Sequence, residues 1–259
     1  AGVSGADRRS RLPAWTVTGY VAITSLIPLL ALVLRALTRA VGLAPWPGNW
    51  TLANFGEALD GAGRAFLTSL GLAAAAAAGA VILGGAVAAI ARGRRRGWIG
   101  SIPILTFAVP GSALAVAVLL AYGGRLRDSV FLILIAYLAK FWALAHRPIA
   151  GSLANLPDDA IRAARVSGAG PWTALRTVVL PLLRPATAAA LLLVFLFAFH
   201  ELTMSALLYG PGSETLAGVI LNLRQIGDVS VTAAMAVLLT AVVLAAGGLL
   251  VLVRRRMPS

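Results

Sequence analysis

The sequence contains no cysteine, two histidines and only nine acidic residues. Charged residues make up 12% of the 259 positions, against about a quarter in soluble domains. The lack of cysteine excludes disulfide bonds, thiolate metal sites and cysteine nucleophiles. His146 and His200 alone leave little room for a histidine cluster, so we predict no metal site.

Apolar residues are abundant instead. They account for 59% of the chain, and the mean hydropathy is +0.89, which indicates that lipid is the main solvent. The net charge of +13 would suggest a nucleic-acid partner in a soluble protein. In a membrane protein, basic residues gather on cytoplasmic loops for topological reasons. We therefore predict a lipid membrane as partner, and no nucleic acid.

Six apolar stretches are long enough to cross a membrane, which requires about 20 residues. They are residues 12–34, 65–91, 98–122, 129–146, 185–208 and 229–253. Backbone groups in lipid must be satisfied within the segment, so each stretch is predicted to be a helix. The first stretch is longer than a signal-peptide core and has no clear cleavage site after it, so we expect it to be retained. The fold predicted is an all-α integral membrane protein, with residues 1–259 as one transmembrane domain.

The distribution of arginine sets the predicted orientation. With six spans, fifteen arginines lie on the side that holds both termini and six on the other side. The positive-inside rule then places both termini in the cytoplasm. The connection 38–64 lies outside in this topology, and it is predicted to be either a short interfacial helix or a covering loop.

The cytoplasmic connection 147–184 is too long for a simple reversal between neighbouring spans, and long loops are usually functional. Pro157 followed by Asp158 and Asp159 predicts a helix start, because proline suits the first turn and acids complement the positive helix end. Gly168 is expected to end this helix in a left-handed conformation.

A second short helix is predicted to begin at Pro171, and Pro181 and Pro185 are expected to end the connection before the fifth span. Two interpretations of the connection remain open. It is an amphipathic hairpin lying on the membrane, or it is a docking platform for a cytoplasmic protein. The small side chains of its first helix favour docking, because they allow another surface to approach closely.

Within this connection, Ala163-Ala164 is followed after three residues by Gly168, and then by Leu180-Pro181. This pattern resembles the EAA loop of ABC importer permeases. The resemblance implies that ATPase coupling is carried by Asp158, Asp159, Arg162, Ala163, Ala164, Gly168, Ala169, Leu180 and Pro181. One position departs from the family pattern, because Arg162 stands where the family has glutamate.

The resemblance implies a type I ABC importer permease fold in a prokaryotic cytoplasmic (inner) membrane, with several partners. Two six-span halves, identical or homologous, form the pathway. A dimer of ABC ATPase subunits binds the loops, and an extracytoplasmic binding protein delivers the substrate. The chain has no Gly-x-x-x-x-Gly-Lys-Ser/Thr phosphate loop. We therefore expect ATP and magnesium in a separate ATPase chain, no cofactor here, and no enzyme activity.

Polar residues also occur inside the fifth apolar stretch. His200, Glu201 and Thr203 are predicted to line the translocation pathway, because ionisable groups in a membrane are costly and usually face protein or water. The alternative is a structural hydrogen bond, or a position near the membrane surface. Lys140 in the fourth stretch is expected to extend towards the cytoplasmic surface. No catalytic constellation is apparent.

Residues 200–217 resemble a subgroup of these permeases that transports ferric iron, aminophosphonates, polyamines or thiamine. Ferric iron is the substrate predicted first. Some relatives in the subgroup are fused chains with twelve spans, so this chain is expected to be either the C-terminal half of such a protein or a single half.

Two other functional classes are considered. A secondary transporter driven by an ion gradient would need no ATPase, and it would carry internal repeats or broken helices around a central site. A membrane-embedded enzyme would need clustered polar residues at one membrane face. The sequence shows no convincing repeat, and a secondary transporter would leave the long cytoplasmic loop unexplained. No polar cluster that would support an enzyme is apparent.

Overall fold

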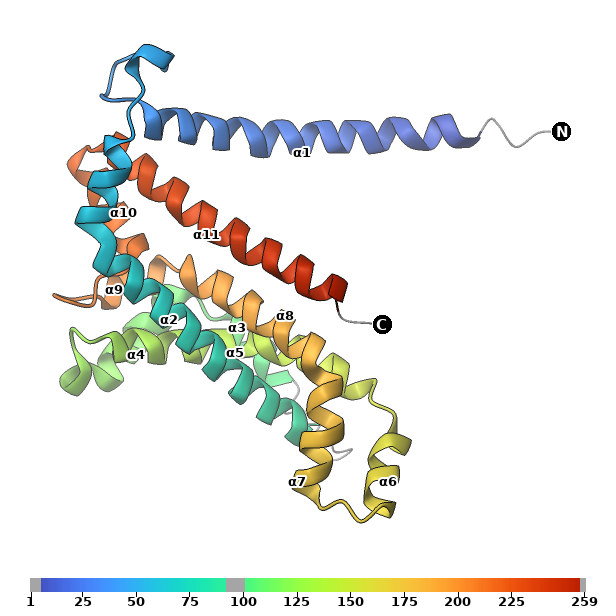
Figure 1. The fold of residues 1–259 in the computed structure, drawn as a ribbon. Coiled ribbons are helices and arrows are strands. Elements are labelled where there is room, and N and C mark those ends of the chain that lie inside the picture. The colour runs from blue at the N-terminus through green and yellow to red at the C-terminus, as the bar shows by residue number, and fades with distance from the viewer. Residues whose placement is uncertain (1–5, 92–100, 257–259) are drawn as a thin grey trace. The chain divides into compact units, whose positions relative to one another are not determined.

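The computed structural model describes residues 6–91 and 101–256, and most of them form helices (Figure 1). In chain order the elements are α1 (Ala6–Leu37), η1 (Pro47–Asn49), α2 (Ala53–Ala91), α3 (Ile102–Ala108), α4 (Gly111–Leu126), α5 (Val130–Ala154), α6 (Asp158–Val166), α7 (Pro171–Ala174), η3 (Leu175–Val179), α8 (Leu180–Phe199), α9 (Thr203–Leu208), α10 (Leu216–Ile226) and α11 (Val229–Arg256). The prediction of an all-α protein is confirmed.

Contacts divide the chain into two compact units. The smaller unit contains Ala1–Gly61 and Asn222–Thr240, and the larger unit contains Ala62–Leu221 and Ala241–Ser259. Among the described residues, five helices are long and apolar enough to cross a membrane, and the bent pair α3–α4 makes a sixth when it is counted as one span. Six were predicted.

The third predicted span, residues 98–122, is not one straight helix. Its first residues lie outside the described part of the chain, and the remainder is divided into α3 and α4, which meet at an angle of 96°. Val109 and Pro110 separate the two helices in extended backbone, with ψ angles of 126° and 139°. Proline disfavours the helical conformation of the residue before it, so the break falls where the sequence places Pro110.

The helix that contains the second predicted span starts earlier than expected. α2 begins at Ala53 and runs for 39 residues without interruption. The predicted alternatives for the connection 38–64, an interfacial helix or a covering loop, therefore do not describe its second half. No proline occurs between Ala53 and Ala91 to end the helix, and the turn-forming residues before it make only the short 3₁₀ turn η1.

Two further helix boundaries differ from the prediction because proline is accommodated inside a helix. α5 contains Pro148 and continues to Ala154, eight residues beyond the predicted end at 146. Pro181 and Pro185 do not end the cytoplasmic connection, because residues Pro171–Phe199 form one continuous helical segment. Its π turn, η3, ends at Val179, two residues before Pro181. Local π adjustments are one of the ways in which transmembrane helices satisfy the backbone groups freed by a proline.

The fifth predicted span, 185–208, is interrupted. α8 ends at Phe199, and the short helix α9 begins at Thr203. His200, which caps α8, has φ −94° and ψ 1°. The polar residues predicted to line the pathway therefore lie at a break between two helices.

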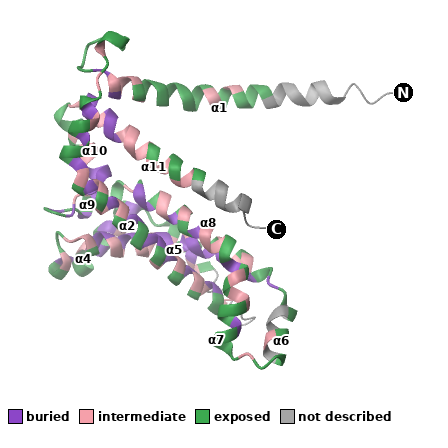
Figure 2. Cartoon of the chain, viewed as in Figure 1, coloured by how far each residue is buried: buried purple, intermediate pink, exposed green. Residues whose placement is uncertain are grey.

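Helix α5 forms the centre of the larger unit and packs against α3, α4, α8 and α9. Figure 2 shows buried residues along α5, including Tyr137, Phe141 and Ile149. α2 also approaches α5 closely at Gly84. A Cβ atom on Gly84 would lie 2.7 Å from the backbone nitrogen of His146 and 2.8 Å from the carbonyl oxygen of Trp142.

In the smaller unit, hydrogen bonds close the connection between α1 and α2. Thr38 and Trp50 form an isolated antiparallel bridge. The Asn54 side chain donates hydrogen bonds to the carbonyl oxygens of Ala36 (2.8 Å) and Thr38 (3.0 Å). Asn54 is buried, so it fixes the start of α2 against the end of α1.

Candidate functional site

The predicted coupling residues form a helical hairpin. We call residues 158–181, from the start of α6 to the first turn of α8, the coupling hairpin. α6 and α7 contact each other and project from the ends of α5 and α8 (Figure 1). Gly168 has a φ of +80°, and the Ala169 N–H donates a 3.0 Å hydrogen bond to the Ala164 carbonyl. This bond is typical of a left-handed helix end, so the predicted role of Gly168 as a helix cap is confirmed.

The second arm of the hairpin is continuous with α8. Gly170 begins it in extended backbone, with φ −65° and ψ 166°, and Pro171 occupies the first turn. The segment Pro171–Phe199 comprises 29 residues, which corresponds to roughly 43 Å at the rise of an α-helix. One helical segment therefore connects the hairpin to the break at His200.

Side chains on the hairpin are strongly exposed. Val166 is 89% exposed and Trp172 is 71% exposed, although both are apolar. Asp159, Arg162 and Ala163 are exposed, whereas Ala164, Ala169 and Pro181 are half-buried; Leu180 is 45% exposed. The side chain of Asp158 lies outside those described. The hairpin thus presents two large apolar groups beside small and basic ones.

A second cluster lies where both broken helices meet α5. Lys140 Nζ lies 3.8 Å from Glu201 Oε2, and the two side chains are 17% and 12% exposed. Gly111, the first residue of α4, lies against the same pair. A Cβ on Gly111 would lie 2.8 Å from Lys140 Nζ and 3.6 Å from Glu201 Oε1. The absence of a side chain at Gly111 therefore leaves room for the ammonium group.

Several hydrogen bonds hold Glu201 in place. Its Oε1 accepts the backbone N–H of Met204 at 3.1 Å, which caps the start of α9. Its carbonyl oxygen accepts the Tyr137 hydroxyl at 3.1 Å and the Ser205 hydroxyl at 2.6 Å. Tyr137 and Ser205 are buried. These bonds leave Oε2 as the oxygen that faces Lys140.

The other predicted pathway residues do not join this cluster. His200 and Thr203 are exposed, and His200 Nδ1 lies 3.3 Å from the Leu196 carbonyl oxygen of its own helix. Lys140 was expected to extend towards the cytoplasmic surface; in the structure its Nζ lies beside Glu201. One signal was present in the sequence: Lys140 and Glu201 are the only Lys, Arg, Asp or Glu residues within the six predicted spans.

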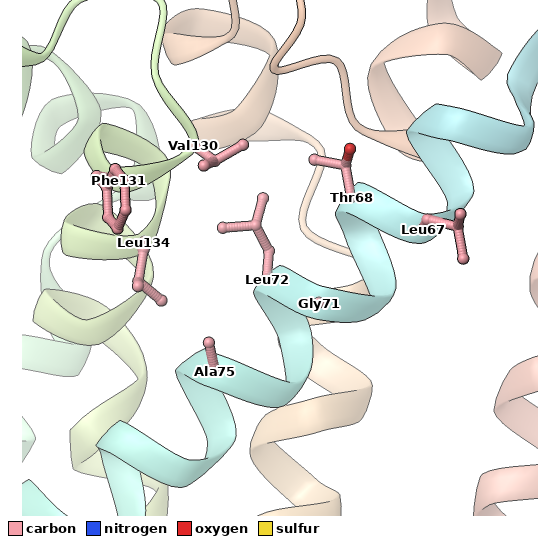
Figure 3. A pocket seen from close by; sticks show the side chains of 8 residues that line it. All are labelled: Leu67, Thr68, Gly71, Leu72, Ala75, Val130, Phe131 and Leu134. Atoms are coloured by element: carbon pink, nitrogen blue, oxygen red, sulfur yellow. The ribbon is translucent and has the colours of Figure 1, made fainter.

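An apolar groove of about 310 Å³ lies between α2 and the start of α5. Figure 3 shows its lining, which consists of Leu67, Thr68, Gly71, Leu72, Ala75, Val130, Phe131 and Leu134. It contains no charged side chain. In the part of the chain that the structure describes, no group of three or more His, Cys, Asp or Glu side chains is placed to hold a metal ion.

Comparison with known proteins identifies the family. The sequence pattern of the family described as "Binding-protein-dependent transport system inner membrane component" matches residues 80–258. PhnV of Salmonella choleraesuis, named as a candidate 2-aminoethylphosphonate transport system permease protein, is 28% identical over 90% of this chain and 94% of its own length.

Two other relatives carry different substrates in their names. The putrescine transport system permease protein PotI of Escherichia coli is 28% identical over 77% of this chain and 75% of its own length. The Fe(3+)-transport system permease protein FbpB 2 of Haemophilus influenzae is 34% identical, over 46% of this chain and 24% of its own length.

Among solved structures, a chain in the crystal structure of a bacterial ABC transporter involved in the import of the acidic polysaccharide alginate is similar in fold. The TM-score is 0.77, and the match covers 100% of both chains at 18% sequence identity. The predicted resemblance to ABC importer permeases is thereby confirmed. This protein belongs to the family of binding-protein-dependent transport system inner membrane components.

Proposed function

We propose that this chain is a permease subunit of an ATP-driven importer in a prokaryotic cytoplasmic membrane. It forms half of the translocation pathway, and a second identical or homologous half completes it. ATP and magnesium bind to a separate ATPase dimer, and an extracytoplasmic binding protein supplies the substrate. The observation that carries the proposal is the family match over residues 80–258, which includes the coupling hairpin and the helix that continues from it.

The mechanism uses the coupling hairpin as a lever. Each ATPase subunit receives one hairpin, and closure of the ATPase dimer on ATP moves the two hairpins together. The segment Pro171–Phe199 is helical throughout, so the movement passes along it to the break at His200. Packed helices have a small number of discrete arrangements, which converts a small displacement into a change of state. The predicted coupling residues Arg162, Ala163 and Gly168 lie on the hairpin.

One contact of the hairpin differs from the family pattern. Arg162 is exposed and positively charged where the family carries glutamate. An ATPase surface that receives this hairpin must therefore accept an arginine at this position. Asp159 is exposed one turn earlier on the same helix and supplies a nearby negative charge.

The length of the matches supports a substrate order different from the one predicted from the sequence, which placed ferric iron first. PhnV matches this chain over nearly all of both sequences, whereas FbpB 2 is matched over less than half of this chain. We therefore propose a 2-aminoethylphosphonate-like substrate first. Ferric iron, putrescine and thiamine are the alternatives.

One observation favours the alternative of a secondary transporter. The bent pair α3–α4 and the interruption between α8 and α9 both lie beside an ion pair, and broken helices around a central site are common in secondary transporters. Family membership and the exposed hairpin support an ATP-driven importer over this alternative.

The proposal is tested by reconstitution. The chain is purified together with its ATPase and binding-protein partners, and the complex is placed in proteoliposomes. Uptake of labelled 2-aminoethylphosphonate, ferric iron and putrescine is measured with and without ATP inside the vesicles. We expect ATP-dependent uptake of 2-aminoethylphosphonate and ATP hydrolysis stimulated by the loaded binding protein. Uptake by the chain without an ATPase would overturn the proposal in favour of the secondary transporter.

A further inference from the structure

The Lys140–Glu201 pair is costly to keep inside a membrane protein. Removing two charges from water costs several kcal/mol per ion, and apolar residues of similar size usually stabilise such a position as well or better. Lys140 and Glu201 are also the only Lys, Arg, Asp or Glu residues in the six predicted spans. Charged residues at such places are functional sites by default. A purely structural role does not require charge here.

The geometry leaves the pair open to a ligand. The distance of 3.8 Å between Lys140 Nζ and Glu201 Oε2 exceeds the range of a hydrogen bond. Both side chains retain some exposure, at 17% and 12%. Glu201 is held by the hydrogen bonds to Met204, Tyr137 and Ser205, while Lys140 has a long, flexible side chain. A ligand can therefore be accommodated by movement of Lys140 alone.

We infer that Lys140 and Glu201 form a binding site for a small zwitterion on its way through the permease. The anionic group of the ligand binds the Lys140 ammonium, and its cationic group binds Glu201 Oε2. This inference rests on the proposed function, and it assigns the substrate class of the same pathway. 2-Aminoethylphosphonate has the required form, because two carbons separate its single ammonium group from its phosphonate.

The charges of the site discriminate among the alternatives. A dication such as putrescine or a trivalent iron ion is attracted by Glu201 but repelled by Lys140 at nearly the same distance. At the low effective dielectric constant of a protein interior, such repulsion is strong. One positive and one negative side chain match a ligand that has an anionic group at one end and a cationic group at the other.

The test measures uptake in proteoliposomes that contain the complete complex. Glu201→Gln keeps an oxygen for the Met204 N–H but removes the negative charge. Lys140→Gln removes the positive charge, and Glu57→Gln, at an exposed position in the smaller unit, is the matched control. Each variant is supplied with labelled 2-aminoethylphosphonate or ethylphosphonate, which lacks the amine. Uptake is expressed relative to the unmodified chain with the same substrate, so the contribution of the binding protein cancels.

Glu201→Gln is expected to lower 2-aminoethylphosphonate uptake about tenfold, the effect of a lost hydrogen bond to a charged group, and to leave ethylphosphonate uptake unchanged. Lys140→Gln is expected to lower both. Equal losses for both substrates in both variants, together with raised ATP hydrolysis in the absence of binding protein, would show a structural latch and overturn the inference. Failure of the unmodified complex to couple ATP to uptake would instead overturn the proposed function.

A second measurement covers the case in which the unmodified complex does not transport ethylphosphonate. Because the chain has no cysteine, Thr203→Cys, at an exposed position two residues after Glu201, carries a single reactive thiol and leaves both charges of the site in place. It is labelled with a methanethiosulfonate reagent, with Glu57→Cys as control. 2-Aminoethylphosphonate with its binding protein is expected to slow labelling at position 203, and putrescine is not. Equal labelling rates with and without 2-aminoethylphosphonate would overturn the inference.

Discussion

Helix α5 and the coupling hairpin belong to the same unit of the chain, but they differ in burial and in what their glycine residues do. α5 is largely buried, and its neighbours approach it at glycine residues such as Gly84 and Gly111. The hairpin is exposed, and Gly168 is needed there for its backbone conformation. Its φ is +80°, and no atom lies within 4 Å of an added Cβ. The two regions therefore tolerate substitution for different reasons: space limits α5, whereas backbone conformation limits the hairpin.

The strongest test of this contrast is made at the α2–α5 contact. Gly84→Ala would place a methyl group 2.7 Å and 2.8 Å from backbone atoms of α5, which cannot move aside as a side chain can. We expect a loss of roughly 1–3 kcal/mol in the free energy of unfolding, measured as a lower melting temperature in detergent. Gly71→Ala is the matched control, because a Cβ there meets nothing within 4 Å. Equal melting temperatures for the two variants would contradict the close packing described.

At the hairpin, the expected loss comes from backbone strain. Gly168→Ala forces an L-residue into the left-handed region at a cost of about 1–2 kcal/mol, and Gly168→Leu adds bulk at the proposed docking surface. Gly170→Ala is the control in the same loop, because Gly170 has a φ of −65° and open space around it. Co-purification with the ATPase should fall for the Gly168 variants and not for Gly170→Ala. Retention of the ATPase by Gly168→Leu would count against docking at this loop.

Two exposed tryptophans, one on the hairpin and one elsewhere, test whether the hairpin surface in particular binds the ATPase. Trp172 is 71% exposed on the hairpin, and Trp46 is 70% exposed in the connection between α1 and α2. Trp172→Ala is expected to weaken binding of the ATPase about tenfold, as for an aromatic anchor at an interface, without a change in melting temperature. Trp46→Ala should leave ATPase binding unchanged. An equal effect of both variants on ATPase affinity would remove the distinction between the two surfaces.

The smallest expected effect concerns the support of Glu201. Tyr137→Phe removes the hydrogen bond to the Glu201 carbonyl, and the loss should be about 1 kcal/mol in unfolding free energy. Tyr122→Phe is the control, since Tyr122 is 50% exposed. Thermal unfolding in detergent measures both. A larger loss for Tyr122→Phe would contradict the assignment of Tyr137 as the residue that holds the helix break.

Some features of the site were predictable because they depend on residues close together in the chain. The helix end at Gly168 follows from the local preference of glycine for positive φ. The helical nature of the long apolar segments follows from the need to satisfy backbone hydrogen bonds in lipid. Both predictions depend on a few neighbouring residues, and neither needs knowledge of distant contacts.

Boundaries set by proline were predicted less well. Pro110 breaks the third apolar stretch, whereas Pro148, Pro181 and Pro185 lie inside helices. The local penalty of proline is similar in each case. The outcome differs because a π turn precedes Pro181 and because neighbouring helices pack around the site, neither of which can be read from one segment.

The amino-acid sequence alone determined the class of this protein: it contains apolar segments of membrane-spanning length and a long basic loop with the Ala163-Ala164 and Gly168 pattern, and it contains no phosphate-binding loop. Only the tertiary structure decided that Lys140 and Glu201, 61 positions apart, face each other across Gly111. The physical reason is that composition and local periodicity determine the structure of a single segment from its own residues. The pairing of two charges depends on where two helices break and how both pack against α5.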